Sequence, residues 1–293
     1  MSIKNIKKLR EMTGAGMMDV KKALDASSDD IDLAIEWLRK NGVAKAAKKA
    51  SRIAAEGIIS IVSNSKKVVI IEINSETDFV ASNADFKKGV EQIAKELLKS
   101  SLKSNDLLGA NDLVTPTGTI KELLIKLTSI IGEKITLRRF AVFNLKDQNV
   151  GFYVHSNSKI GTIVLGTAMK SSLLRDIAMH VAAMDPQFLS MDDISKETKA
   201  KEKSLAEELL KDQLVGKPEK IQKAIIQGKV NKTLGEFTLL EQPFVKEPSK
   251  KIKDLQGQGK IDSFIRYEVG EGIQKAENNF ADEVAAQIAS AKK

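Results

Sequence analysis

Hydrophobic residues in the first forty positions recur at helical spacing in three short runs. A Gly-Ala-Gly turn at 14–16 separates the first two runs, and the serine and aspartate residues of 27–30 can cap the third. Gly42 stands where the C-terminal cap of that third helix is expected. The pattern therefore predicts a small three-helix bundle over 1–42. Its apolar positions are Ile6, Leu9, Val20, Ala23, Leu24, Ile31, Ala34, Ile35 and Leu38.

A basic stretch follows the bundle. Residues 39–52 carry six positive charges and no acidic residue, and their alanine content favours a helix. The sequence therefore predicts a basic helical linker over 43–56. Two roles stay open for it: a solvated connector, or an electrostatic guide toward an acidic partner.

The spacing of apolar residues changes to a period of two from Gly57 onward. The segment 57–73 predicts a β-hairpin that turns at 63–66, and 86–98 predicts an amphipathic helix. The same order of strand, turn, strand and helix recurs later, with the same Ser-Asn-Ser-Lys tetrapeptide at 156–159. Because both the order and the tetrapeptide repeat, the sequence predicts an internal duplication.

The repeat predicts an α+β fold with two related subdomains, each an antiparallel sheet with helices on one face. The first subdomain is expected over 57–146. The second is expected over 147–190 and again over 235–275, with strands at 235–245 and 264–273.

Between 191 and 234 the second subdomain is interrupted by charged sequence with narrow apolar stripes. A glycine and a proline at 216–218 separate two helical stretches, so the pattern predicts a projecting antiparallel coiled coil over 191–234. The alanine-rich residues 276–293 predict a C-terminal helix. The stripes expected to face each other are Leu205, Leu209 and Val215 in the first helix and Ile221, Ile225 and Leu234 in the second.

Composition narrows the classes of function. The chain of 293 residues contains no cysteine, which excludes disulfides, a disulfide-linked dimer and thiolate-based chemistry. No apolar run approaches the roughly 18 residues that span a bilayer, and the N-terminus lacks a signal-peptide core, so we expect a cytoplasmic protein. The net charge of +8 admits acidic proteins and nucleic acids, but an aromatic content of 4% leaves few residues for base stacking.

Candidate catalytic groups are few. His180 lies in an apolar helix and is expected to be a structural residue of the core. His155 lies at the second hairpin turn and has no catalytic partner in the sequence. The glycines of 257–260 lack the spacing of a phosphate-binding loop, and the carboxylates are scattered. We therefore expect no covalent catalysis, no cofactor and no metal.

Two sets of apolar residues call for another explanation. Met17 and Met18 are adjacent at a helix start and cannot share one narrow face, so at least one is expected to point outward. Flexible methionine suits a partner surface, although packing of both within the bundle stays open. Phe79 follows the first hairpin in the tetrapeptide Thr-Asp-Phe-Val, where it is either a core plug or a protruding anchor.

Several sequence motifs point to one family. The first half of the chain contains, in order, LREMTGAGMMDVKKAL, AKAAKKASRIAAEG, NSETDFVA and IGEKITLRRF. The second half contains HVAAMDPQFL, QPFVKEP and FIRYEVGEGI. In this order, and over essentially the whole chain, these motifs resemble the bacterial translation elongation factor Ts family, the guanine-nucleotide exchange factors of the GTPase elongation factor Tu.

The resemblance implies partner contacts at specific positions. The first domain would be a ubiquitin-associated-like bundle that contacts the nucleotide domain of elongation factor Tu, and Asp78 and Phe79 would lie in the family's intruding loop. After its hairpin histidine this chain has a Ser-Asn-Ser turn, where the family commonly has glycine and a shorter turn. The implied contact residues are Arg10, Met17, Met18, Asp78, Phe79, Ile131, Gly132 and His155, and Thr77 and Val80 complete the Mg²⁺-dislocation loop.

The resemblance also implies a mechanism. Insertion of Phe79 between two helices of the GTPase would shift the elements that support Mg²⁺, and GDP would leave. GTP would then refill the site and displace the factor, without covalent catalysis. The implied partner is elongation factor Tu in its GDP-bound and nucleotide-free states, in a one-to-one or two-to-two assembly, with neither nucleic acid nor membrane.

Two other classes of function compete with nucleotide exchange. One is a basic RNA-binding or ribosome-associated protein, and the other is a helical adaptor unrelated to exchange. RNA binding predicts basic residues beside aromatic ones, yet Phe79 lies among Glu76, Asp78 and Asp85. An exchange factor is expected to accelerate release of GDP from elongation factor Tu, which neither alternative predicts.

Overall fold

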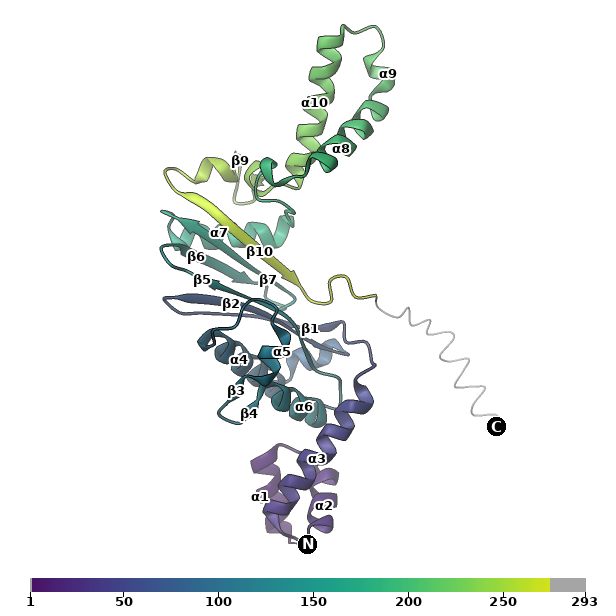
Figure 1. The fold of residues 1–293 in the computed structure, drawn as a ribbon, viewed down its shortest axis with the longest axis vertical. Helices are drawn as coiled ribbons and strands as arrows, with labels where there is room; N and C mark the ends of the chain where they lie inside the picture. Colours follow the sequence, from purple (N-terminus) through teal and green to yellow (C-terminus); the bar gives the residue numbers. More distant parts are fainter. Residues whose placement is uncertain (1, 275–293) are drawn as a thin grey trace, which may run out of the picture. The chain divides into compact units, whose positions relative to one another are not determined.

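The computed structural model describes residues 2–274 of the chain, and the C-terminal helix expected at 276–293 lies outside the described residues. The fold is α+β, built from helices and antiparallel sheets (Figure 1). Every helix in the described part is too short or too polar to cross a bilayer. Packing divides the described chain into a first unit, formed by residues 2–60, 71–141 and 268–274, and a second unit, formed by residues 61–70 and 142–267.

The first unit begins with the expected three-helix bundle of α1 (Ile3–Thr13), α2 (Met17–Ala26) and α3 (Ile31–Lys49). Gly14 ends α1 with a left-handed φ of 71°, a conformation that glycine adopts without steric cost. Asp30 caps α3 by accepting a hydrogen bond from the backbone of Leu33 at 2.8 Å. The fully buried residues of this small core are Leu9, Val20, Ala23, Leu24 and Ala34.

The helix α3 is longer than the sequence predicts, and the expected C-terminal cap at Gly42 is wrong. Gly42 is buried within α3, and a Cβ there would lie 3.7 Å from the side chain of Ser129 in α6 (Ile120–Ile131). The alanines that follow favour continued helix, and α3 packs against α6. The start of the predicted linker therefore belongs to α3.

Strands β1 (Glu56–Ser63), β2 (Lys67–Ser75) and β5 (Thr136–Asn144) form the first sheet, in the order β1-β2-β5. The helices α4 (Ala84–Lys99) and α6 pack together on one face of this sheet (Figure 1). The turn of the hairpin lies where the sequence predicts it, but β2 is buried along almost its whole length rather than at alternate residues. The remaining elements are α5 (Leu107–Asp112), β3 (Val114–Thr115) and β4 (Gly118–Thr119).

The second sheet has the order β10-β7-β6, from β6 (Asn149–Val154), β7 (Ile160–Thr167) and β10 (Lys260–Glu268). The helix α7 (Ser171–Met184) packs against β6 and β7. In both sheets a hairpin is followed by a helix, and a later strand pairs with the second strand of the hairpin. This shared connectivity supports the proposed internal duplication.

The insertion is a pair of antiparallel helices, α8 (Lys196–Leu209) and α10 (Glu219–Glu236), with the short α9 (Lys211–Leu214) between them. The predicted stripes are wrong at four positions, because Leu205, Leu209 and Val215 of the first stripe and Ile221 of the second are exposed. The packed face is shifted by one residue, and it continues across the break between α8 and α9. That face consists of Ile194, Ala206, Leu210, Leu214, Ile226, Val230 and Leu234.

The chain after the insertion also differs from the prediction. The strand expected at 235–245 is wrong, because α10 continues to Glu236 and only β8 (Pro243–Phe244) is extended there. The last strand, β10, begins at Lys260 rather than 264, and it ends at Glu268 because Gly270 takes a left-handed φ of 76°. The other elements are the 3₁₀-helices η2 (Met191–Asp193), η3 (Leu239–Glu241) and η4 (Ile252–Leu255), and β9 (Glu247–Lys251).

His180 is fully buried, as expected of a structural core residue. Its Nε2 lies 2.9 Å from Oε1 of Gln242, and the backbone N–H of Val245 donates to its Nδ1 at 3.3 Å. The Gln242 amide is oriented by donating to the carbonyl of Glu236 at 2.7 Å, so its oxygen faces the ring. Both contacts fix the neutral tautomer with the proton on Nε2. Burial lowers the pKa of His180, although the hydrogen bond with Gln242 opposes this.

We expect the free energy of unfolding to decrease as the pH falls below about 6.5, by up to about 1.4 kcal/mol per pH unit from His180 alone. The reason is that the unfolded imidazole takes up a proton near its ordinary pKa, whereas the buried ring does so only at lower pH. Urea unfolding between pH 7.5 and 5.5 measures the slope. The variant His180→Gln should lose this component, and an unchanged slope in that variant would contradict the assignment.

Candidate functional site

The connection between β2 and α4 presents an aromatic side chain to solvent. It forms a short 3₁₀-helix, η1 (Asp78–Ser82), in which Phe79 is 83% exposed and Asp78 is also exposed. Val80, the next residue, is 5% exposed and packs inward. A partner that covered this side chain would remove its apolar surface from water, which is favourable.

The end of η1 is attached to the start of α4. Val80 anchors η1 in the core, and its carbonyl accepts a hydrogen bond from the backbone of Asn83 at 2.9 Å. The side chain of Asn83 caps α4 by accepting bonds from the backbones of Asp85 and Phe86 at 2.9 and 3.0 Å. Phe79 therefore projects from a segment whose following residues are fixed.

The start of η1 is attached to the turn after α6. The Glu133 carboxylate accepts two hydrogen bonds from Thr77, one from the backbone N–H at 2.8 Å and one from the hydroxyl at 2.5 Å. In return, the Glu76 carboxylate accepts the backbone N–H of Lys134 at 2.6 Å. The sequence analysis missed Glu133 and Glu76, because no local spacing relates segments that lie 56 residues apart.

The same turn is bonded to the linker. Gly132 ends α6 at a left-handed φ of 85° and is exposed, and Lys49 donates to its carbonyl. The Lys134 ammonium donates to the carbonyls of Ala50 and Arg52 at 2.7 and 2.8 Å. Ile131, the last residue of α6, is half-buried beside Gly132. The turn 132–134 thus joins the linker to the base of η1.

The bundle presents three of the predicted contact residues. Met17 and Met18 are 43% and 63% exposed at the start of α2, and Arg10 is exposed on α1. Asp19 is held by Lys45 of α3 at 2.7 Å, which attaches the start of α2 to the long helix. Both methionines therefore lie at the surface of the bundle, outside its small core.

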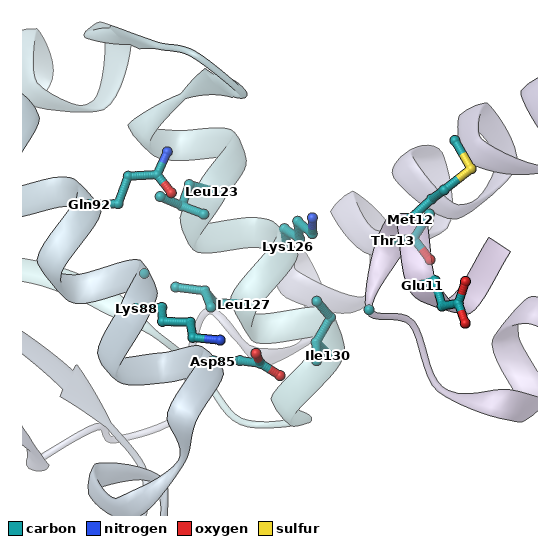
Figure 2. Close-up of a pocket in the computed structure, with 12 residues that line it drawn as sticks. Glu11, Met12, Thr13, Asp85, Lys88, Gln92, Leu123, Lys126, Leu127 and Ile130 are labelled. Atoms are coloured by element: carbon teal, nitrogen blue, oxygen red, sulfur yellow. The ribbon is translucent and has the colours of Figure 1, made fainter. Parts of the chain in front are cut away.

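One hollow in the first unit lies between the bundle and the core helices. Figure 2 shows residues of α1 on one side of it and residues of α4 and α6 on the other. Its walls carry both signs of charge, and its apolar lining comes mainly from α6. The lining includes residues close in sequence to three predicted contact segments. Gly14 precedes α2, Asp85 follows η1, and Ile130 precedes the turn after α6. The lining residues are Glu11, Met12, Thr13, Gly14, Asp85, Lys88, Gly89, Gln92, Leu123, Lys126, Leu127 and Ile130.

His155 belongs to the second unit, at the turn between β6 and β7. It is exposed, its Nδ1 lies 3.2 Å from Oδ1 of Asn157, and its ring meets Tyr153 edge-on with centroids 6.2 Å apart. Oδ1 of Asn157 also accepts the backbone N–H of Lys159 at 3.0 Å. Local contacts therefore order the longer Ser-Asn-Ser turn around this histidine.

A buried ion cluster holds the sheet beneath the site, and sequence reasoning missed it. The Glu72 carboxylate on β2 is fully buried, and it accepts hydrogen bonds from Nη1 of Arg138 at 2.9 Å and from Nε of Arg139 at 2.5 Å. It also accepts the backbone N–H of Gly270 at 2.9 Å. Although burial acts to lower the pKa of Arg139, hydrogen bonds with Glu271 and Glu72 raise it above its usual value.

Comparisons with known proteins agree with the motifs in the sequence. A sequence model of the family described as "Elongation factor TS" matches residues 76–271. The protein named "Elongation factor Ts" from Mycoplasmopsis pulmonis (strain UAB CTIP) is 46% identical over 290 residues, which cover 97% of this chain and 96% of that protein. The matched family region includes the η1 segment, the turn 132–134 and His155, and it begins after the bundle.

We expect Glu72→Gln to lower the free energy of unfolding by about 3 kcal/mol, because the two arginines would lose their buried counter-charge. Urea unfolding measures the change. The matched control is Glu91→Gln, which removes an exposed pair with Lys95 and should change stability by less than about 0.5 kcal/mol. Equal effects of the two substitutions would show that the buried cluster does not stabilise the sheet.

Proposed function

The chain belongs to the elongation factor Ts family, and from this we propose that it is a guanine-nucleotide exchange factor of protein synthesis that acts on elongation factor Tu. The observation that carries the proposal is Phe79, an aromatic side chain that is 83% exposed on a segment fixed at both ends. Such an anchor gains free energy when a partner buries it, and it loses little conformational entropy on binding.

The proposed action is selective binding of an open state of the GTPase. A GTPase of this kind holds GDP through backbone amides, a lysine and Mg²⁺ on the phosphates. Phe79, together with Asp78, would insert between two helices of the partner and displace the elements that support its Mg²⁺. The phosphates would then lose compensating charge, and GDP would leave. The factor accelerates release because it binds this open state more tightly than the closed one.

Displacement of the factor follows from thermodynamic linkage. If binding of this chain weakens the partner's grip on nucleotide, then binding of nucleotide weakens the grip on this chain by the same factor. Incoming GTP would therefore release the protein. The cycle needs no covalent step, so the proposed factor is not an enzyme with a catalytic residue, and its place of action is the cytoplasm.

Further contacts would come from the other predicted residues. Arg10, Met17 and Met18 would contact the nucleotide domain from the bundle, and Ile131 with Gly132 would do so from the turn after α6. Exposed methionines can adapt their shape to a partner surface, which supports this role for α2. His155 would contact the same partner from the second unit. The complex is proposed to be one-to-one or two-to-two.

We expect Phe79→Ala to lower stimulated GDP release from elongation factor Tu by roughly 30- to 1000-fold, since truncating a buried interface aromatic costs about 2–4 kcal/mol. Release of labelled GDP at limiting factor measures the effect. Thermal stability should stay close to that of the wild type, because the ring is exposed in the free protein.

The matched control for this variant is Leu108→Ala, which removes an exposed apolar side chain from α5 of the same unit. It should release GDP at the wild-type rate. Asp78→Ala should act in the same direction as Phe79→Ala, and the double variant should be less than additive because the two residues are adjacent. Wild-type exchange by Phe79→Ala would refute insertion of this ring.

A further inference from the structure

The bonding of Thr77 is unusual for its position. Thr77 is the N-cap residue of η1, where a threonine hydroxyl commonly accepts a hydrogen bond from the first turn of its own helix. Among the described residues, its side chain makes no such cap bond. Its hydroxyl instead donates to the Glu133 carboxylate at 2.5 Å, and its backbone N–H donates to the same group at 2.8 Å. The start of η1 is therefore held by a distant segment.

The bonds between the two segments run in both directions. Glu133 accepts from the backbone of Thr77, and Glu76 accepts from the backbone of Lys134 at 2.6 Å. Each segment thus supplies a carboxylate to an amide of the other. Ser75 adds a bond from its hydroxyl to the Thr77 carbonyl at 2.9 Å. This exchange fixes the backbone direction at the residue that precedes Asp78 and Phe79.

We propose that Glu133 is a positioning residue, which holds the 77–80 segment so that Phe79 already protrudes before the partner arrives. This inference rests on the proposed function, and it requires no contact between Glu133 and the partner. A five-residue 3₁₀-helix has little stability of its own. Without the bonds to Glu133, an exposed phenylalanine ring gains free energy by folding back onto nearby apolar surface.

The expected size of the effect follows from population arithmetic. If the freed segment held Phe79 in the protruding form only a tenth of the time, apparent affinity for the partner would fall about tenfold. The loss would act through the 77–80 segment and not through the bundle, to which Arg10, Met17 and Met18 belong. A residue that merely stabilises the fold would instead lower the melting temperature and weaken every contact.

The first experiment compares four variants in release of labelled GDP from elongation factor Tu at limiting factor. Glu133→Ala should be about tenfold slower than the wild type, and Thr77→Val, which keeps the backbone bond, roughly threefold slower. Thr77→Ser keeps the hydroxyl that bonds to Glu133, so it should release GDP at the wild-type rate. Glu91→Ala, which removes an exposed carboxylate of α4, is the matched control and should leave exchange unchanged.

The second experiment tests whether Glu133 acts through Phe79. In a Phe79→Ala background, adding Glu133→Ala should slow GDP release by less than about twofold, because the side chain being positioned is already absent. Independent, additive losses would overturn the inference. So would wild-type exchange by Glu133→Ala, or a defect in Thr77→Ser as large as that in Thr77→Val.

Amide hydrogen exchange separates this inference from the proposed function. Glu133→Ala and Thr77→Val should speed amide hydrogen exchange at residues 77–82, while the amides of the core strands β2 and β5 keep their protection. If Phe79→Ala stimulates GDP release like the wild type, insertion of the ring fails. Faster amide hydrogen exchange at residues 77–82 in Glu133→Ala would still support the proposal that Glu133 holds this segment. Unchanged amide hydrogen exchange at these residues would overturn it.

Discussion

Glu72 is a fully buried carboxylate on β2, and the position of the exposed segment depends on how that charge is compensated. Arg138 and Arg139 on β5 pair with it, and the backbone of Gly270 bonds to it where the chain returns after β10. These contacts fasten β2 to its neighbour and to the end of the last strand. Since β2 ends at Ser75, a rigid strand leads directly into the bonds that Thr77 makes with Glu133. If the charge of Glu72 were left uncompensated, β2 would be held less firmly, and so would the segment that follows it.

An exchange factor works through binding energy rather than through chemistry. The first unit holds three predicted contact segments on separate elements: the start of α2, the η1 segment and the turn after α6. The hollow between α1, α4 and α6 is lined by neighbours of all three (Figure 2). In the proposed cycle, the bundle supplies affinity and Phe79 supplies selectivity for the open state of the partner.

Periodicity predicted the elements whose stability is local. The first hairpin and α4 lie where apolar residues and turn residues predict them, and the second hairpin turns at the predicted tetrapeptide 156–159. Errors arose where packing overrode local preference. Gly42 lies within α3, where it packs beside Ser129 of α6, and the packed face of α8 is shifted by one residue from the Leu205 stripe. The bonds of Glu133 and Glu72 join segments far apart in sequence, so no spacing could have indicated them. The family resemblance, rather than the local sequence, predicted that Phe79 is exposed, because the local sequence favoured a core plug.

Photo-crosslinking from position 79 tests the central claim most directly. A photoreactive phenylalanine analogue at this position, in the complex with nucleotide-free elongation factor Tu, should crosslink to the nucleotide domain beside its Mg²⁺ site. The yield should fall when GTP is added, because nucleotide and factor oppose each other's binding. The same analogue in place of Leu108 provides the exposed control. Crosslinks from position 79 to another part of the GTPase, or equal yields from both positions, would contradict the account.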